Sequence, residues 1–430
     1  MLLCLLQVGW LVIAPAEWEA ELKPLVAARA AQGFTARFLA LEDAVGGDTQ
    51  GDAPERIKRR LYEEWHERGL THALLVGDAD VFPVRFMVLD RGTAPAFNYA
   101  FYACDLYYAD LARNDGSLDD WNVCADGFHA RYFGEVRGEF NKSDPINYDG
   151  ISYLPEIAVG RWPVSTREEL RAVVAKTLTW DAAPPARSAL LLHAGEWVDE
   201  RPRLGARAED LTAAGWAVER QFYDTASAPT PERITTALKA GVGLALHAGH
   251  GFSAGWHLCL ASEHEAILAA APPAIYFSVG CSTANFVNEP PYQSYLDADG
   301  LPHRGTNDGE VFTAPPPPPA PLQPVRFNSS SFGERMLRMP AGGAAAYVGC
   351  VTGSQPAALS LMDGFLIAAA AGAPTVGEAW SAAVRHYHAA ERLEELQPNA
   401  DWYPPSIYFQ GMKFILYGDP ALAMPRPAVK

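Results

Sequence analysis

Short apolar runs alternate with amphipathic segments along the first part of the chain. Val12–Ala14, Phe38–Leu41 and His72–Val76 are apolar and only a few residues long, which is typical of strands buried on both faces of a sheet. Between them, Glu17–Ala31 has apolar residues at helical spacing, and Pro54–Arg68 begins with a proline, which suits the first turn of a helix. This alternation predicts parallel βαβ units with right-handed crossovers.

The alternation returns after an irregular stretch. A strand is expected at Ile157–Val159, followed by a helix that ends at about Trp180. Ser165 and Glu168 have the spacing of a capping box, so the helix is expected to open at Ser165.

The segment 181–188, which contains two prolines, is expected to be a hinge between two half-domains. A chain of 430 residues is long enough for two such units. We therefore expect an α/β protein with mostly parallel sheets, made of an N-terminal half-domain, 1–184, and a catalytic half-domain, 185–430.

Two apolar runs in the second half end in small-residue turns, and each turn presents one reactive side chain. Val242–Leu246 leads to His250, which has a glycine on either side, and Ala274–Val279 leads to Cys281, which follows a glycine. Ligands bind at the carboxyl ends of the strands in open α/β sheets. If the two strands are neighbours, the imidazole and the thiol lie together.

A thiol beside an imidazole can act as a nucleophile, because an imidazolium lowers the pKa of a nearby thiol and so favours the thiolate. The main-chain amides of Gly251 and Cys281 are the expected donors to an oxyanion. Taken alone, each side chain also has a structural interpretation: Cys281 as a small buried hydrophobe and His250 as a turn residue.

The segments HAGHG and YFSVGCSTANF resemble the catalytic segments of the gingipain family of cysteine peptidases, which belongs to the caspase and legumain clan. Further matches follow in the family's order and span nearly the whole chain. They are LVIAP (Leu11–Pro15), LLVGDAD (Leu74–Asp80), DLYYADL (Asp105–Leu111), EIAVGRWPVSTREEL (Glu156–Leu170), FGERMLRMPAGGAAAYVG (Phe332–Gly349) and LYGDPAL (Leu416–Leu422). The resemblance implies a caspase-like three-layer fold and cysteine endopeptidase activity.

The resemblance also implies roles for two acidic residues that follow the expected strand Ala189–His193. In the family, an acid at the place of Glu196 orients the catalytic histidine, as a carboxylate that accepts the second ring N–H would do. The alternative for Glu196 is a purely electrostatic role at a helix N-terminus. Glu200 falls where the arginine-specific relatives carry the acid of the specificity pocket, which implies cleavage after basic residues.

The net charge of the chain limits which classes of binding partner are expected. A formal net charge of −17 disfavours nucleic acid and anionic membranes as partners. It suits a cationic peptide or protein substrate, although an acidic surface also serves solubility alone.

Cysteine usage and the N-terminus indicate a cytoplasmic protein, with secretion, as in the family, as the alternative. No apolar run has the roughly 18 residues needed to span a bilayer. The N-terminal MLLCLLQVGWLVIAPA has no Lys or Arg before its apolar run, so we interpret it as structure rather than as a signal peptide. If Cys281 is a free thiol, five cysteines remain, an odd number without CxxC spacing, and this favours a reducing compartment. They are Cys4, Cys104, Cys124, Cys259 and Cys350.

No cofactor or catalytic metal is expected, because no H-E-x-x-H or CxxC pattern occurs. The segment 105–150 is rich in Asp, Asn and Gly, and in relatives a calcium-like loop is found here. It lacks the spacing of an EF-hand, so a solvated loop is expected, with structural calcium as the alternative.

An insert at about 287–331 departs from the family. Its first part predicts a hairpin with a turn at Asp299-Gly300, and the run Pro315–Pro324 predicts polyproline II structure. Three interpretations stay open: a lid over the active site, a tolerated surface excursion, or a docking site for a regulatory partner.

Together, these features predict a cysteine endopeptidase that works through a Cys–His thioester mechanism, with Cys281, His250 and Glu196 as its catalytic residues. One alternative is a sortase-like transpeptidase, in which an amine replaces water. The other is a protease-like binding module that its proline-rich insert keeps inactive.

Overall fold

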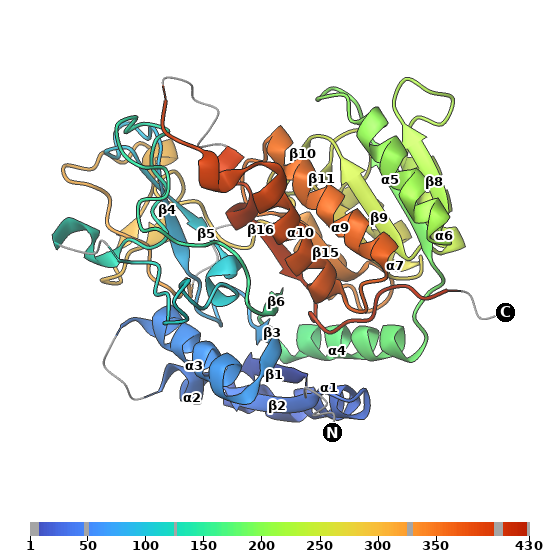
Figure 1. The fold of residues 1–430 in the computed structure, drawn as a ribbon, viewed down its shortest axis with the longest axis horizontal. Helices are drawn as coiled ribbons and strands as arrows, with labels where there is room; N and C mark the ends of the chain where they lie inside the picture. The colour runs from blue at the N-terminus through green and yellow to red at the C-terminus, as the bar shows by residue number, and fades with distance from the viewer. Residues whose placement is uncertain (1–7, 47–50, 124–126, 325–329, 400–406, 428–430) are drawn as a thin grey trace.

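The computed structural model describes residues 8–46, 51–123, 127–324, 330–399 and 407–427. Its centre is a ten-stranded sheet with the strand order β2-β1-β3-β6-β16-β15-β12-β9-β7-β8 (Figure 1). Neighbouring strands run parallel, except that β15 and β16 are antiparallel. In this order the strands are Thr35–Ala40, Gly9–Ala14, Leu70–Val76, Ala158–Trp162, Phe414–Tyr417, Ala344–Cys350, Ala274–Ser278, Leu244–Ala248, Ser188–His193 and Ala217–Phe222. The predicted mostly parallel α/β sheet is confirmed.

Helices cover both faces of the sheet and complete three layers (Figure 1). Successive side chains of β1 point to opposite faces, so Leu11 and Ile13 join one apolar core while Trp10 and Val12 join the other. The first core is closed by α2 (Leu41–Val45), α3 (Ala53–Arg68), α5 (Arg201–Ala213), α9 (Leu359–Ala371) and α10 (Val376–Ala390). The second is closed by α1 (Glu19–Ala31), α4 (Arg167–Ala182), α6 (Pro231–Ala240), α7 (Glu265–Ala269) and α8 (Phe332–Arg338).

Two predicted boundaries are wrong by a residue or more. Leu41 begins α2 instead of ending β2. The capping box of α4 is formed by Thr166 and Glu169 rather than by Ser165 and Glu168. The Ser165 hydroxyl donates to Asp80 instead, and this contact takes it away from the helix N-terminus.

The two predicted halves share this one sheet, and the division at residue 184 stays a prediction. Strand β16, from the C-terminal end of the chain, lies between β6 and β15. Immediately after β16, the buried Asp419 carboxylate accepts hydrogen bonds from Trp10 at 2.9 Å and from Arg29 at 2.8 Å. These contacts join the last strand to the first strand and helix.

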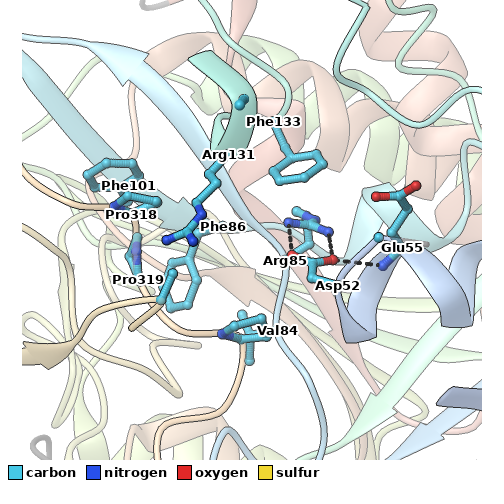
Figure 2. Close-up of a pocket in the computed structure, with 14 residues that line it drawn as sticks. Asp52, Glu55, Val84, Arg85, Phe86, Phe101, Arg131, Phe133, Pro318 and Pro319 are labelled. Atoms are coloured by element: carbon cyan, nitrogen blue, oxygen red, sulfur yellow. Dashed lines mark hydrogen bonds and ion pairs between the residues drawn. The ribbon is translucent and has the colours of Figure 1, made fainter. Parts of the chain in front are cut away.

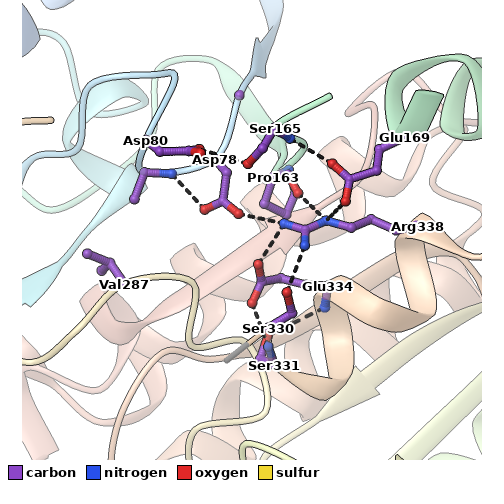
Figure 3. A network of polar contacts seen from close by, with 12 residues as sticks. Asp78, Asp80, Pro163, Ser165, Glu169, Val287, Ser330, Ser331, Glu334 and Arg338 are labelled. Atoms are coloured by element: carbon purple, nitrogen blue, oxygen red, sulfur yellow. Dashed lines mark hydrogen bonds and ion pairs between the residues drawn. The ribbon is translucent and has the colours of Figure 1, made fainter. Parts of the chain in front are cut away.

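A second buried network joins the halves on the face covered by α8 (Figure 3). The Arg338 guanidinium donates to Asp78 at 2.6 Å and to Glu334 at 2.7 Å. It also donates to the carbonyl of Pro163 at 2.6 Å. Two carboxylates and one guanidinium leave an excess negative charge, and burial, together with Asp78, raises the pKa of Glu334 to about 8.

The insert packs against the first half of the chain. Its predicted hairpin is confirmed as β13 (Tyr295–Leu296) and β14 (Pro302–His303). The carbonyl of Pro290 accepts a hydrogen bond from Phe101 at 2.7 Å, and that of Pro321 accepts one from Val84 at 2.8 Å. These contacts seat the insert on the hairpin formed by β4 (Phe86–Asp90) and β5 (Tyr99–Ala103).

Prolines of the insert close a cavity of about 360 Å³ on this hairpin (Figure 2). Arg85 forms its floor, with its guanidinium 3.5 Å from the centroid of the Phe133 ring and paired with Asp52. Pro318 and Pro319 line the opposite wall. The proline run is therefore part of a packed structure rather than a free strand of polyproline.

None of the helices in the described part of the chain has the length and apolar character needed to span a bilayer.

Candidate active site

Strands β9 and β12 bring His250 and Cys281 to the same edge of the sheet. The two strands are parallel neighbours in which His247 pairs with Ser278, and each candidate residue lies three positions further along the chain, in the turn that follows its strand. The glycines beside them, Gly251 and Gly280, are in direct contact: a Cβ on Gly280 would lie 2.8 Å from the Cα of Gly251. Because only glycine fits at this contact, the two turns meet backbone to backbone.

Cys281 differs from the other described cysteines in its exposure. Cys104, Cys259 and Cys350 are buried free thiols, and burial raises the pKa of each to about 12. The Cys281 thiol is free and partly exposed, and its Sγ accepts a hydrogen bond from the main-chain N–H of Ser354 at 3.3 Å. Cys4 and Cys124 lie outside the described residues.

The ring of His250 is held from the loop that follows β7. Its Nε2 lies 2.8 Å from the main-chain carbonyl oxygen of Glu196. A carbonyl can only accept a hydrogen bond, so Nε2 carries the proton and Nδ1 keeps its lone pair. This tautomer leaves His250 ready to take a proton at Nδ1.

The predicted contact between the Glu196 carboxylate and His250 does not form. Glu196 has a positive φ of 57°, which turns its carbonyl toward His250, while its side chain points to solvent and bonds His257 Nε2 at 3.1 Å. Glu196 therefore holds the histidine through its main chain, which sequence reasoning missed.

Two buried histidines stabilise the loops and strands around the site but do not point into it. His193, at the end of β7, accepts a hydrogen bond from the main-chain N–H of Glu200 at 2.9 Å and so anchors the loop that carries Glu196. His247 bonds Ser278 Oγ at 3.0 Å and stacks on Trp256. Burial lowers the pKa of His247 to about 3, so it stays neutral.

Among the residues that the structure describes, none accepts a hydrogen bond from either expected oxyanion donor, the N–H of Gly251 or that of Cys281. His257 N–H donates to His250 O at 3.0 Å, so the next pair of the β10–β11 hairpin (Gly251–Phe252 and Gly255–Trp256) is a non-hydrogen-bonded pair. The N–H of Gly251 therefore points away from the hairpin. The N–H of Cys281 has no acceptor within the described residues.

Glu200 lies in the same loop as Glu196, at the N-cap position of α5, but its side chain makes no capping hydrogen bond. Its carboxylate is half-buried and ion-paired with Arg203 at 2.9 Å, and Arg203 also approaches Asp363 at 3.5 Å. Burial raises the pKa values of Glu200 and Asp363. Glu200 is therefore not an unpaired anion, as a simple specificity pocket would require.

The catalytic pair is open to solvent, with His250 exposed and Cys281 partly exposed. No hydrogen bond or ion pair joins His250 or Cys281 to any insert residue that the structure describes. The base of the insert approaches the site: the partly buried Glu289 carboxyl bonds Thr352. The main-chain carbonyl of Thr352 accepts a hydrogen bond at 2.8 Å from the N–H of Ser282, the residue after Cys281.

Within the described ranges, no group of three or more His, Cys, Asp and Glu side chains is arranged to hold a metal ion. In the acidic loop, Asp105 is instead paired with the buried Arg161 at 2.7 Å. Asp110 lies close to Lys58, and burial raises the pKa of Asp110 to about 8. In the described part of this loop we therefore find no set of carboxylates that supports the alternative of a calcium site.

The fold has three layers, and a partly exposed thiol and an oriented imidazole follow adjoining parallel strands of its central sheet. This arrangement defines a cysteine hydrolase of caspase-like fold. The family model of peptidase family C25 matches residues 5–425, and the chain belongs to this family. It is thus a cysteine-type peptidase that acts on peptide or protein substrates.

Solved structures agree on the fold. The Arg-specific cysteine proteinase gingipain R aligns with a TM-score of 0.64 at 15% identity, over 97% of this chain and 78% of its own. The complex of Porphyromonas gingivalis RgpB pro- and mature domains aligns with a TM-score of 0.63 at 16% identity, over 97% of this chain and 79% of its own. A structure described only as a protease aligns with a TM-score of 0.61 at 18% identity, over 98% of this chain and 79% of its own. No curated protein matches the sequence.

Proposed function

We propose that Cys281 is the nucleophile of this peptidase and His250 its general acid and base. The observation that supports the proposal most directly is the contact between Gly251 and Gly280, which brings together the backbones of the two turns that carry these residues. The partly exposed thiol and the free Nδ1 of His250 supply the two chemical requirements.

In the proposed reaction, His250 Nδ1 takes the thiol proton and the thiolate attacks the scissile carbonyl. The N–H groups of Gly251 and Cys281 donate to the oxyanion that forms. The imidazolium then gives its proton to the leaving amine, which departs as the C–N bond breaks. Water, activated by His250, hydrolyses the thioester and releases the carboxylate. The mechanism needs no cofactor.

Cleavage after basic residues is the proposed specificity. The gingipain R neighbour is described as Arg-specific, and Glu200 with Asp363 brings two partly buried carboxylates to the loop that holds His250. Arg203 pairs with both Glu200 and Asp363, so the basic side chain of a substrate would share these two carboxylates with Arg203.

The specificity is tested with three peptides that differ only in having arginine, lysine or norleucine before the cleaved bond. We expect a preference for the basic residues, and Glu200→Gln should lower the arginine-to-norleucine ratio of kcat/KM roughly tenfold. Glu209→Gln, an exposed change on the same helix, is the matched control. A wild-type enzyme that prefers norleucine would remove Glu200 from the pocket. A product with a new amide bond would select transpeptidation.

We further propose that the protein works in a reducing, cytoplasmic compartment and that the insert is where a regulatory partner docks. The free thiols of Cys104, Cys259, Cys281 and Cys350 support the first proposal. The contact of Glu289 with the loop beside Cys281 supports the second. Deleting residues 292–324 should leave hydrolysis of a short peptide intact, because Cys281 is partly exposed and no hydrogen bond or ion pair joins it to the described residues of the insert. A large gain in rate would instead identify the insert as an inhibitory lid.

A further inference from the structure

The loop between β15 and the helix that follows it is built around the Cys281 thiol. The main-chain N–H of Ser354 donates to Cys281 Sγ at 3.3 Å, and the carbonyl of Thr352 accepts from the N–H of Ser282 at 2.8 Å. The loop therefore touches the thiol and the residue after it, and any shift in the loop moves the hydrogen bond to Sγ.

The peptide unit that bonds the thiol is held at its other end by a lysine. Gly353 O and Ser354 N–H belong to the same peptide bond. The oxygen accepts from Lys413 Nζ at 2.9 Å, and the N–H donates to Cys281 Sγ. An ammonium at the oxygen end polarises the peptide, so its N–H becomes a stronger donor toward a negative sulfur.

Lys413 is placed for this contact by its surroundings. It is only 2% exposed, its Nζ lies 3.9 Å from the centroid of the Phe409 ring, and its main-chain carbonyl accepts from Val351 N–H at 2.9 Å. Its ammonium makes no ion pair with a carboxylate in the described part of the chain. A buried cation that no carboxylate contacts directly is costly, which favours a role for its charge.

Other charged groups face Lys413 from several elements. Burial lowers the pKa of Lys413 to about 8, which leaves most of it charged at neutral pH. Arg91 lowers the pKa of Lys413 further, whereas the carboxylates of Glu289 and Glu139 raise it. Cys350 also faces Lys413, but burial raises the pKa of this thiol to about 12, so it is neutral at neutral pH.

We propose that Lys413 is a positioning residue for catalysis: through the Gly353–Ser354 peptide, its ammonium holds and polarises the N–H that stabilises the Cys281 thiolate. This inference rests on the proposed role of Cys281 as the nucleophile. Lys413 touches neither substrate nor sulfur, so its effect reaches the reaction only through the loop.

The test is the pH dependence of Cys281 alkylation by iodoacetamide, followed by peptide mass spectrometry. Lys413→Gln keeps a neutral donor to Gly353 O but removes the charge. We expect it to raise the pH midpoint of alkylation by about one unit, as for the loss of a nearby opposite charge. At neutral pH, kcat should fall roughly tenfold with little change in KM, because the loss concerns the thiolate and not substrate binding.

Two variants serve as controls. Lys413→Arg keeps the charge and should leave the midpoint near the wild-type value. Lys176→Met removes another buried lysine, whose Nζ donates to the carbonyl of Leu337 at the end of α8 at 2.6 Å, and it should leave the midpoint unchanged.

An unchanged midpoint and kcat in Lys413→Gln would overturn the inference and leave the proposed function intact. Peptidase activity that survives Cys281→Ala would instead overturn the proposed function itself. If Lys413→Gln does not melt cooperatively, Lys413→Arg decides: a rise of a full unit with the charge retained would contradict the role of charge.

Discussion

A single methyl group at Gly280 should separate the two turns that carry the catalytic pair. In the structure, a Cβ at this position would lie 2.8 Å from Gly251 Cα and 3.0 Å from Gly251 N. Ordinary van der Waals contact begins near 3.4 Å, so the turns must move apart by about 0.6 Å (3.4 − 2.8). Both neighbours are main-chain atoms, so rotation of a side chain cannot relieve the contact.

The expected result of Gly280→Ala is a large kinetic loss with a modest loss of stability. A displacement approaching 1 Å at a reacting centre lowers the rate by up to about 100-fold, so kcat/KM should fall roughly 10- to 100-fold. Overpacking of this size costs about 1–3 kcal/mol of folding free energy. Peptide hydrolysis and thermal melting measure the two effects separately.

Gly205→Ala is the matched control, because a Cβ at Gly205 in α5 meets no atom within 4 Å. It should preserve kcat/KM and raise stability by roughly 0.5–1 kcal/mol, since alanine favours the helix. If Gly280→Ala keeps kcat/KM within about twofold of the wild type, the contact between the turns does not position the catalytic pair.

Three further substitutions test the electrostatics. Glu196→Gln should lower kcat/KM less than about fivefold, because the main-chain carbonyl, not the exposed carboxylate, holds His250; peptide hydrolysis measures it. The pKa of Glu334 is raised to about 8, so between about pH 4.5 and pH 8 this residue keeps its proton in the folded protein and loses it in the unfolded chain. The free energy of unfolding therefore falls as the pH rises through this range. Glu334→Gln should flatten this decline, by at most about 1.4 kcal/mol per pH unit, in melts recorded across that range. Asp419→Asn should destabilise the fold by roughly 3–5 kcal/mol in denaturant titrations, because it leaves the buried Arg29 without this partner.

Each of these three predictions has a contradicting outcome. A 100-fold loss in Glu196→Gln would restore the carboxylate as the group that orients the histidine. An unaltered pH slope in Glu334→Gln would mean that the network of Figure 3 holds no extra proton. Asp419→Asn should be compared with Glu19→Gln, which removes an exposed pair with Lys23; equal effects would show that burial adds nothing to the Asp419 contact.

The apolar pattern of the sequence predicts the sheet well because buried parallel strands are apolar on both faces. The runs ending near Leu246 and Val279 are such strands, and their parallel pairing puts His250 and Cys281 at equivalent positions. Strand order does not follow from the pattern. Strand β16 pairs with β6 although about 250 residues (163–413) lie between them, an arrangement set by tertiary packing.

The supporting groups of the site were less predictable. His193, Ser354 and Lys413 act through main-chain hydrogen bonds, which leave no motif in the sequence. The expected contact of the Glu196 carboxylate with His250 does not form, because at a positive φ the residue directs its carbonyl toward His250 and its side chain toward His257. The sequence predicts polyproline II structure for the proline run but not what it packs against, because its partners on the β4–β5 hairpin lie more than 200 residues earlier in the chain.

Covalent labelling tests the central claim most directly. A peptidyl acyloxymethyl ketone with arginine next to the reactive group should modify the wild-type protein once, at Cys281, as shown by intact-mass measurement and peptide mapping. Labelling should be lost in Cys281→Ala and slowed at least roughly 100-fold in His250→Ala, because without the imidazole the thiol lacks its base. Modification of another cysteine, or equal rates in wild type and His250→Ala, would contradict the assignment of these two residues as the catalytic pair.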